Sequence, residues 1–173
     1  MIIYKDYVTG DELFTDSYKM KLVDGVIYEV EGKYIQRKVG DVVLAGANPS
    51  QEEQEEESEE GTESGIDVVL NQRLVEAKFY ENKEDYTKYI KAYMKSLMKR
   101  VEETKPAELD AFKKGAQEAV KSLLGRHGNM QFFMGESMDS DKGMVIPVEY
   151  KDTPTGQVPT LYFFKHGLVE EKV

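Results

Sequence analysis

Short runs of alternating hydrophobic and polar residues occur on both sides of the chain's centre. They are rich in β-branched and aromatic residues and are separated by turn-forming residues, a pattern that is typical of β-strands. The chain opens with an apolar run at residues 2–8. The runs at 26–30 and 34–39 flank a Glu-Gly-Lys turn and predict a β-hairpin. Pro147 favours an edge strand or a bulge, because proline cannot donate to a sheet ladder. The other predicted strands are residues 42–44, 66–70, 74–79, 130–134, 144–150 and 160–164.

Between the two β regions, apolar residues recur every three or four positions, which predicts amphipathic helices. The first helix is expected to begin after Asn82, a suitable N-cap residue that is followed by acidic residues in the first turn. Pro106 cannot continue this helix but suits the start of a second one, which ends at Gly125 or Gly128. Residues 82–128 are therefore expected to form an antiparallel helical hairpin inserted into a mainly β protein.

Lysines form a separate stripe along the first predicted helix. The whole hairpin is mildly basic, since residues 84–126 contain ten Lys or Arg against seven Asp or Glu. One interpretation is a solvated face with pairs such as Glu84 and Lys88, which lie four residues apart. The other is a docking surface for an acidic partner. The stripe consists of Lys88, Lys91, Lys95 and Lys99.

The net charge of −10 comes mostly from one segment, because eight glutamates and no Lys or Arg lie between Gln51 and Glu63. This run repels itself and has almost no apolar residue, so residues 46–64 are expected to form a mobile acidic loop. It could serve as a solvated tether or as a cation- or partner-binding segment. The negative charge argues against nucleic acid and anionic lipid as partners.

The sequence predicts a cytoplasmic protein with no membrane span. No apolar run approaches the roughly 20 residues that a membrane-spanning helix needs. Charged residues interrupt the first 14 residues, so we expect no signal peptide there.

The residue types needed for common catalytic sites are scarce. The chain has no cysteine and only two histidines, His127 and His166, so we expect no transition-metal site. Residues 139–143 resemble the start of a calcium loop, but glycine is at position five and Tyr150 is at position twelve, where an EF-hand has glutamate. No phosphate-binding loop or nucleophile elbow occurs. The sequence therefore predicts a binding protein rather than an enzyme.

Two segments resemble the signature motifs of the translationally controlled tumour protein family. One is Ala-Gly-Ala-Asn-Pro-Ser at residues 45–50, followed by the acidic run. The other is Gln-Phe-Phe-Met-Gly-Glu-Ser-Met-Asp at residues 131–139. Matching segments at the start, in the first predicted helix and at the end extend the resemblance over essentially the whole chain. Gln51 departs from the pattern, which usually has a small residue there.

The resemblance implies an α+β fold that is mainly β, with a tent-like arrangement of β-sheets, an inserted helical hairpin and a mobile loop. It predicts one domain with its β-tent core at residues 1–45, 65–80 and 130–173. The fold is similar to that of zinc-containing chaperones of small GTPases. Because this chain lacks the zinc-binding cysteines, its core must be stabilised by packing alone.

The family resemblance also implies functions. Members are described as cytoplasmic, calcium-binding, microtubule-associated, growth-promoting and anti-apoptotic, and some occur outside cells without a signal peptide. We therefore expect tubulin, small GTPases and apoptosis regulators as partners. An alternative is a nucleotide-exchange or chaperone factor for a small Ras-like GTPase, Rheb.

Individual roles follow from matching positions. Glu12 matches an acidic residue implicated in the GTPase contact, although it could equally be a plain surface carboxylate. Asn48 and Gln131 match positions linked to calcium, and residues 83–121 match the segment linked to tubulin. Two neutral amides should bind calcium only weakly, with dissociation constants of ~10⁻⁴ to 10⁻³ M or above. No obligatory cofactor is expected.

Overall fold

The computed structural model describes residues 1–38, 62–139 and 141–173. The predicted strand at residues 42–44 and most of the predicted acidic loop lie outside the described residues. Residues 62–64, which the prediction places in the loop, belong to a strand. The described part combines antiparallel sheets with a helical hairpin, which confirms the predicted α+β, mainly β class.

The largest sheet has six antiparallel strands in the order β3-β4-β10-β9-β8-β7. β8 has the predicted bounds, whereas β3 was not predicted. The strands are β3 (Lys19–Val23), β4 (Ile27–Glu31), β7 (Val75–Glu76), β8 (Met130–Met134), β9 (Ile146–Thr153) and β10 (Gly156–Phe164).

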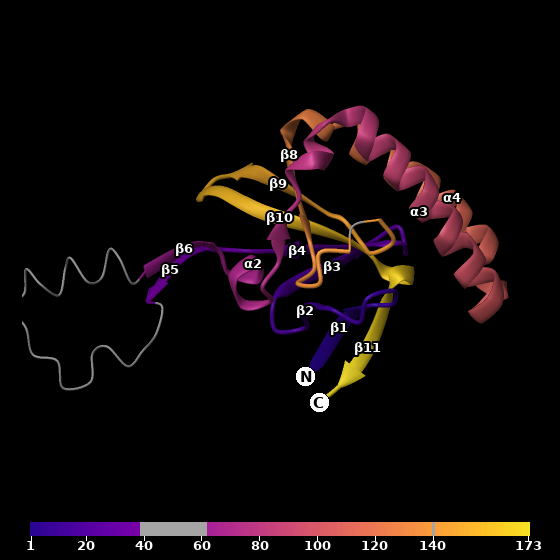
Figure 1. The fold of residues 1–173 in the computed structure, drawn as a ribbon, viewed down its shortest axis with the longest axis horizontal. Helices are drawn as coiled ribbons and strands as arrows, with labels where there is room; N and C mark the ends of the chain where they lie inside the picture. The colour runs from indigo at the N-terminus through magenta and orange to yellow at the C-terminus, as the bar shows by residue number, and fades with distance from the viewer. Residues whose placement is uncertain (39–61, 140) are drawn as a thin grey trace, which may run out of the picture.

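A second sheet of three antiparallel strands, in the order β11-β1-β2, packs against one face of the first. The rings of Phe14 in β2 and Phe163 in β10 lie 4.3 Å apart between centroids, and both side chains are buried. The two chain ends lie next to each other on this sheet (Figure 1). Its strands are β1 (Ile2–Asp6), β2 (Glu12–Thr15) and β11 (Leu168–Lys172).

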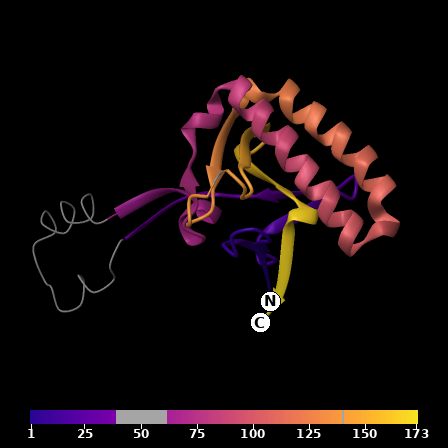
Figure 2. The same cartoon turned by 45° about the vertical axis from the view of Figure 1, so that its right-hand side comes forward.

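The helical hairpin covers the other face of the six-stranded sheet (Figure 2). Helix α3 (Lys83–Thr104) is capped by the Asn82 side chain, which accepts hydrogen bonds from the backbone of the first turn. A 3₁₀ turn, η3 (Pro106–Glu108), leads into α4 (Leu109–Gly125), so the predicted N-cap and the Gly125 end are confirmed. Neighbouring residues of a strand point to opposite faces of the sheet. Phe163 of β10 faces the three-stranded sheet, so Phe164 faces the hairpin, and its ring centroid lies 6.1 Å from that of Tyr93 in α3. Among the described residues, no helix combines the length and apolar character needed to cross a membrane.

The predicted hairpin between residues 26–30 and 34–39 is wrong. β4 is paired on both sides, by β3 and β10, and has no free edge. Gly32 donates its backbone N–H to Pro159 at 2.8 Å, and the chain then leaves the sheet. β5 (Tyr34–Lys38) pairs instead with β6 (Thr62–Ile66), and the two form an arm that extends from the body of the protein (Figure 1).

The predicted strand at residues 66–70 is also wrong, because this segment forms the short helix α2 (Asp67–Asn71). The Asp67 carboxylate accepts hydrogen bonds from the backbone of Val68 at 2.8 Å and of Lys33 at 2.9 Å, which turns the chain at the foot of the arm. The β-branched composition misled the prediction, since five residues are too few to display a helical period. The predicted strand at 74–79 shrinks to β7 and is followed by a 3₁₀ turn, η2 (Lys78–Glu81).

Pro147 lies in an interior strand and not in an edge strand. It is paired with Phe132 of β8, but the ladder with β10 begins only at the next residue, Val148. Pro159 of β10 repeats this arrangement, because the ladder with β4 begins at Thr160. Each proline therefore lies where one neighbouring strand has not yet started to pair, and its missing N–H is tolerated there.

Candidate functional site

The four lysines of the predicted stripe lie on the solvent face of α3, and all four are exposed. Tyr89, Tyr93 and Leu97, on the opposite face, are buried against the sheet. The proposed pair of Glu84 and Lys88 is not formed. Within residues 1–38, 62–139 and 141–173, none of the four lysines has a carboxylate within 4.0 Å. The ammonium groups are thus open to a partner.

Glu12 lies at the start of β2 and lines a surface pocket of about 430 Å³, which we call the Glu12 pocket. Three separate segments form its walls: the turn between β1 and β2, the end of α2, and the turn after β8. The lining residues are Gly10, Asp11, Glu12, Asn71, Gln72, Arg73 and Glu136. Only Glu12 was predicted from the sequence, since the other walls are brought to it by the fold.

The Glu12 pocket contains three carboxylates and one cation. Asp11 accepts hydrogen bonds from the backbone and hydroxyl of Ser137, at 3.2 and 2.6 Å. Arg73 pairs with Glu136 at 3.4 Å, and both side chains are largely exposed. Glu12 has no Lys or Arg within 4.0 Å among the described residues, which leaves its carboxylate available to a basic group.

Close backbone packing fixes the walls of the Glu12 pocket. A Cβ atom at Gly135 would lie 2.3 Å from the Asp11 carboxylate, so a larger residue there would displace the Asp11 side chain from the turn after β8. Arg73 adopts a left-handed backbone conformation, with φ of +57°. The chain reverses at this residue between α2 and β7.

Gln131 lies in β8 of the six-stranded sheet. Its amide oxygen accepts a hydrogen bond from the Tyr150 hydroxyl at 3.0 Å. Asn48, its predicted companion, lies outside the described residues. Within the described ranges, no three His, Asp or Glu side chains are placed to hold a metal ion. Calcium binding by Asn48 and Gln131 therefore stays a prediction.

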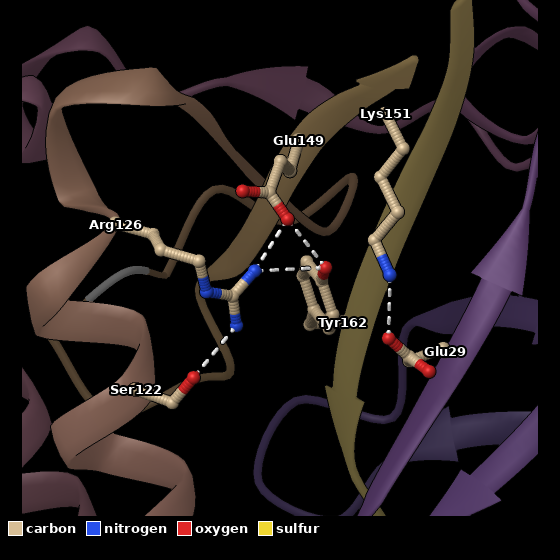
Figure 3. Close-up of polar contacts among 6 residues, drawn as sticks. All are labelled: Glu29, Ser122, Arg126, Glu149, Lys151 and Tyr162. Atoms are coloured by element: carbon tan, nitrogen blue, oxygen red, sulfur yellow. Dashed lines mark hydrogen bonds and ion pairs between the residues drawn. The ribbon is translucent and has the colours of Figure 1, made fainter. Parts of the chain in front are cut away.

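A polar cluster that sequence reasoning missed joins the end of α4 to the six-stranded sheet (Figure 3). Arg126 pairs with Glu149 of β9 and also donates to the Tyr162 hydroxyl at 3.1 Å and to Ser122 at 3.1 Å. Tyr162 donates to Glu149 at 2.7 Å, and burial, followed by this hydrogen bond, raises the pKa of Tyr162. Nearby, Lys151 pairs with Glu29 at 2.8 Å. These charges satisfy one another, so we assign the cluster to positioning α4 rather than to binding.

The two histidines have separate environments. His127 is buried, and its Nε2 lies 2.8 Å from the backbone oxygen of Tyr80, to which it donates a hydrogen bond. His166 lies between α3 and β11, with Nε2 3.4 Å from Glu108. Burial, the largest cause, lowers the pKa of His166, while Glu108 acts in the opposite direction.

Comparisons with known proteins agree with the earlier resemblance. A family model described as translationally controlled tumour protein matches residues 1–169. The curated translationally-controlled tumor protein homologs of Plutella xylostella and Drosophila melanogaster are each 54% identical over 172 residues, which cover 99% of this chain and 99% of each relative. Neither name states a catalytic activity.

Solved structures of the same kind resemble the fold described above. The translationally controlled tumor-associated protein p23fyp of Schizosaccharomyces pombe superposes with a TM-score of 0.79 at 42% identity, over 100% of both chains. The NMR structure of the translationally-controlled tumor protein of Caenorhabditis elegans gives a TM-score of 0.75 at 43% identity, over 100% of this chain and 99% of the other.

Proposed function

The chain belongs to the translationally controlled tumour protein family, and from that premise we propose that it is a cytoplasmic, non-catalytic protein that works by binding other proteins. The observation that carries the proposal is the exposed lysine stripe on α3. A row of four ammonium groups without carboxylate partners among the described residues attracts an acidic surface. Tubulin is the partner that we assign to this surface, and microtubule association is the resulting activity.

Electrostatics should dominate this contact. Lys91, Lys95 and Lys99 are four residues apart and lie one above another along the helix. Since the ammonium groups are exposed, salt should weaken the contact over a Debye length of about 8 Å at physiological ionic strength. The rigid helix holds the charges in a fixed row, so the spacing of the lysines contributes as well as their number.

Co-sedimentation with microtubules tests the assignment. We expect the triple variant Lys91→Glu, Lys95→Glu and Lys99→Glu to lose co-sedimentation while keeping the circular dichroism spectrum of the wild type. A control with Lys33→Glu, Lys142→Glu and Lys172→Glu changes the net charge equally at exposed positions outside α3. If both variants lose co-sedimentation equally, net charge and not the lysine stripe explains binding. If the first variant binds like the wild type, α3 is not the docking surface.

A second function is favoured by the Glu12 pocket. Its three carboxylates outnumber its one cation, so it suits a basic side chain of a partner. We assign it to a small Ras-like GTPase such as Rheb, with the chain acting as an exchange or chaperone factor. Such a factor needs no nucleophile or cofactor, because it displaces the nucleotide by inserting groups near its phosphates and magnesium.

Nucleotide release from the GTPase tests this second function. We expect the protein to accelerate release at stoichiometric ratios and the variant Glu12→Gln to lose that effect. Glu103→Gln removes an equal charge from the exposed end of α3 and should behave like the wild type. A wild-type protein that leaves the release rate unchanged would contradict the proposal.

Growth promotion and protection from apoptosis would follow from these contacts and from binding to apoptosis regulators. Calcium would act as a weak ligand and not as an obligatory cofactor. Titration of labelled protein with calcium, followed by amide NMR, tests this point. Shifts at Gln131 and Asn48 would support the predicted site, and unmoved signals at both would remove it.

A further inference from the structure

A second pocket lies beneath the C-terminal half of α3, where the helix crosses above β1, β4 and β11. We call it the His166 pocket. It encloses about 60 Å³, which is room for a few water molecules or one group of about the size of a phosphate. It takes no part in either of the proposed protein contacts, since the lysine stripe faces solvent and the Glu12 pocket has entirely different lining residues.

The lining of the His166 pocket is positively charged in a protein whose net charge is −10. Arg100, Lys105 and Lys165 contribute three permanent cations, against one lining carboxylate, Glu170. Arg100 and Lys165 have no carboxylate within 4.0 Å among the described residues, and Lys105 reaches Glu108 only at 4.0 Å. The local charge is therefore not neutralised by the neighbours that the structure describes.

Arg100 is held in place by its other contacts. Its Nε donates to the backbone oxygen of His166 at 3.0 Å, and its guanidinium lies 4.5 Å from the centroid of the Tyr7 ring. A guanidinium fixed in this way loses little further conformational freedom when it binds a ligand, and its planar array of donors suits an oxyanion.

His166 lines the same pocket, and one of its ring nitrogens is unpaired. Its side chain is 7% exposed, yet Nδ1 has no hydrogen-bond partner among the described residues. The ring is fixed on its other side by Phe112, at 4.6 Å between centroids, and by Glu108. The Glu108 carboxylate can only accept a hydrogen bond, so Nε2 carries the proton of the neutral ring and Nδ1 is left as an unpaired acceptor. Nδ1 can donate to an anion only when the ring is protonated, and a bound anion favours that form.

We propose that the His166 pocket binds a phosphate group. The three cations outnumber the single lining carboxylate, a protonated His166 ring adds a fourth positive charge, and the volume suits one phosphate group rather than a whole nucleotide. The phosphate could be a free ion or a monoester carried on a side chain. Both present the same oxygens to the pocket, and they differ in whether one oxygen is substituted.

Binding should depend on pH through His166. The charged or titratable groups around the ring are Arg100 and Lys105 of α3, Glu108 of η3, Lys165, Glu170 of β11, and the hydroxyls of Tyr4 and Tyr28. Burial, the largest cause, lowers the pKa of His166, Glu108 raises it, and Lys165 and Lys105 lower it. A bound anion would favour the protonated ring, so the complex should take up a proton as it forms.

NMR titration of labelled protein with inorganic phosphate, at constant ionic strength with chloride as the balancing anion, tests the proposal. We expect saturable shifts of the His166 ring and the Arg100 Nε–H at about millimolar concentrations. Sulfate, which keeps its charge over this range, should bind more tightly as the pH falls from about 7.5 to about 5.5. Shifts that chloride reproduces equally would overturn the proposal.

Matched variants separate the pocket from general charge. Lys165→Gln should weaken phosphate binding about tenfold, the effect of losing one charge-assisted contact. Lys33→Gln removes an equal charge from the exposed turn between β4 and β5 and should bind like the wild type. Equal affinities of the two variants would overturn the proposal. His166→Gln serves as a further variant and should abolish the pH dependence measured with sulfate.

A phosphoserine peptide distinguishes the two sources of phosphate. Displacement of inorganic phosphate by the peptide, but not by its unphosphorylated form, would identify a site for phosphorylated side chains. Binding of inorganic phosphate that the peptide does not displace would identify a site for the free ion. A pocket that takes neither is not a phosphate site.

Discussion

Helix α3 carries two faces with the same spacing and opposite chemistry. Its inner face is buried against the six-stranded sheet, and its outer face, which carries the lysine stripe, is exposed to solvent. The buried residues are Tyr86, Tyr89, Ile90, Tyr93, Leu97 and Val101. The exposed residues are Lys88, Lys91, Lys95 and Lys99.

The difference shows how one helix can separate stability from binding. On the inner face each side chain has several neighbours, so substitutions should change the free energy of unfolding. On the outer face the lysines lack partners among the described residues, so substitutions should change binding and barely affect folding. The predictions below test this separation, beginning with the largest expected effect.

Leu97→Ala should have the largest effect on stability. The side chain is fully buried and lies near Gly167, which connects β10 to β11. Removing it leaves a cavity, and the expected loss is about 2–5 kcal/mol in the free energy of unfolding. Urea denaturation measures this loss, with Lys99→Ala as the outer-face control within about 0.5 kcal/mol. A loss as small as the control's would mean that α3 is not tightly packed on the sheet.

Tyr89→Phe should have the next largest effect. The Tyr89 hydroxyl donates to the backbone oxygen of Gly143 at 2.7 Å and accepts from the backbone N–H of Val145 at 2.8 Å. The substitution leaves both buried backbone groups unpaired, at a cost of about 1–3 kcal/mol. Denaturation gives the total, and faster amide exchange at Val145 would localise it. Unchanged exchange there would show that the hydroxyl does not hold this segment.

Tyr86→Phe should act in the opposite direction, although Tyr86 lies only one turn away. Its hydroxyl is buried without a hydrogen-bond partner among the described residues, and burial raises the pKa of Tyr86. Removing an unsatisfied polar atom should stabilise the protein by up to about 1 kcal/mol. The same denaturation experiment measures the sign. A loss equal to that of Tyr89→Phe would reveal a partner for the Tyr86 hydroxyl.

The inner face of α3 could be predicted from the sequence because a helix of this length repeats its pattern several times. The N-cap at Asn82, the break at Pro106 and the bounds of β8 follow from local rules, and the structure confirms them. The pairing of β4 did not follow. The local hairpin signal to β5 competed with one neighbouring strand, β3, and one distant strand, β10, and the long-range pairs with β10 satisfied β4 on the side where β5 would have joined it.

The candidate sites show the same difference between local patterns, which the sequence reveals, and long-range contacts, which it does not. The lysine stripe could be predicted because all its members lie on one helix. The surroundings of Glu12 could not, because Arg73 and Glu136 reach the pocket through the turns after α2 and β8. The His166 pocket assembles residues more than 160 positions apart in the sequence, from Tyr4 to Glu170, and no local pattern marks it.

Lys95→Glu should have the smallest effect on stability and the clearest effect on binding. Lys91 and Lys99 lie four residues before and after it, so the wild-type stripe contains two like-charge neighbours of Lys95. Reversing the central charge converts both into favourable pairs, and the gain should be a few tenths of a kcal/mol, or about half a kcal/mol at low salt. The same change should weaken microtubule co-sedimentation. Thermal unfolding and co-sedimentation of one preparation would measure both, and Lys33→Glu serves as the control for net charge. A rise in stability together with a loss of binding would show that the row of lysines is kept against its own repulsion because a partner requires it. A loss of both would mean that the outer face also contributes to the fold.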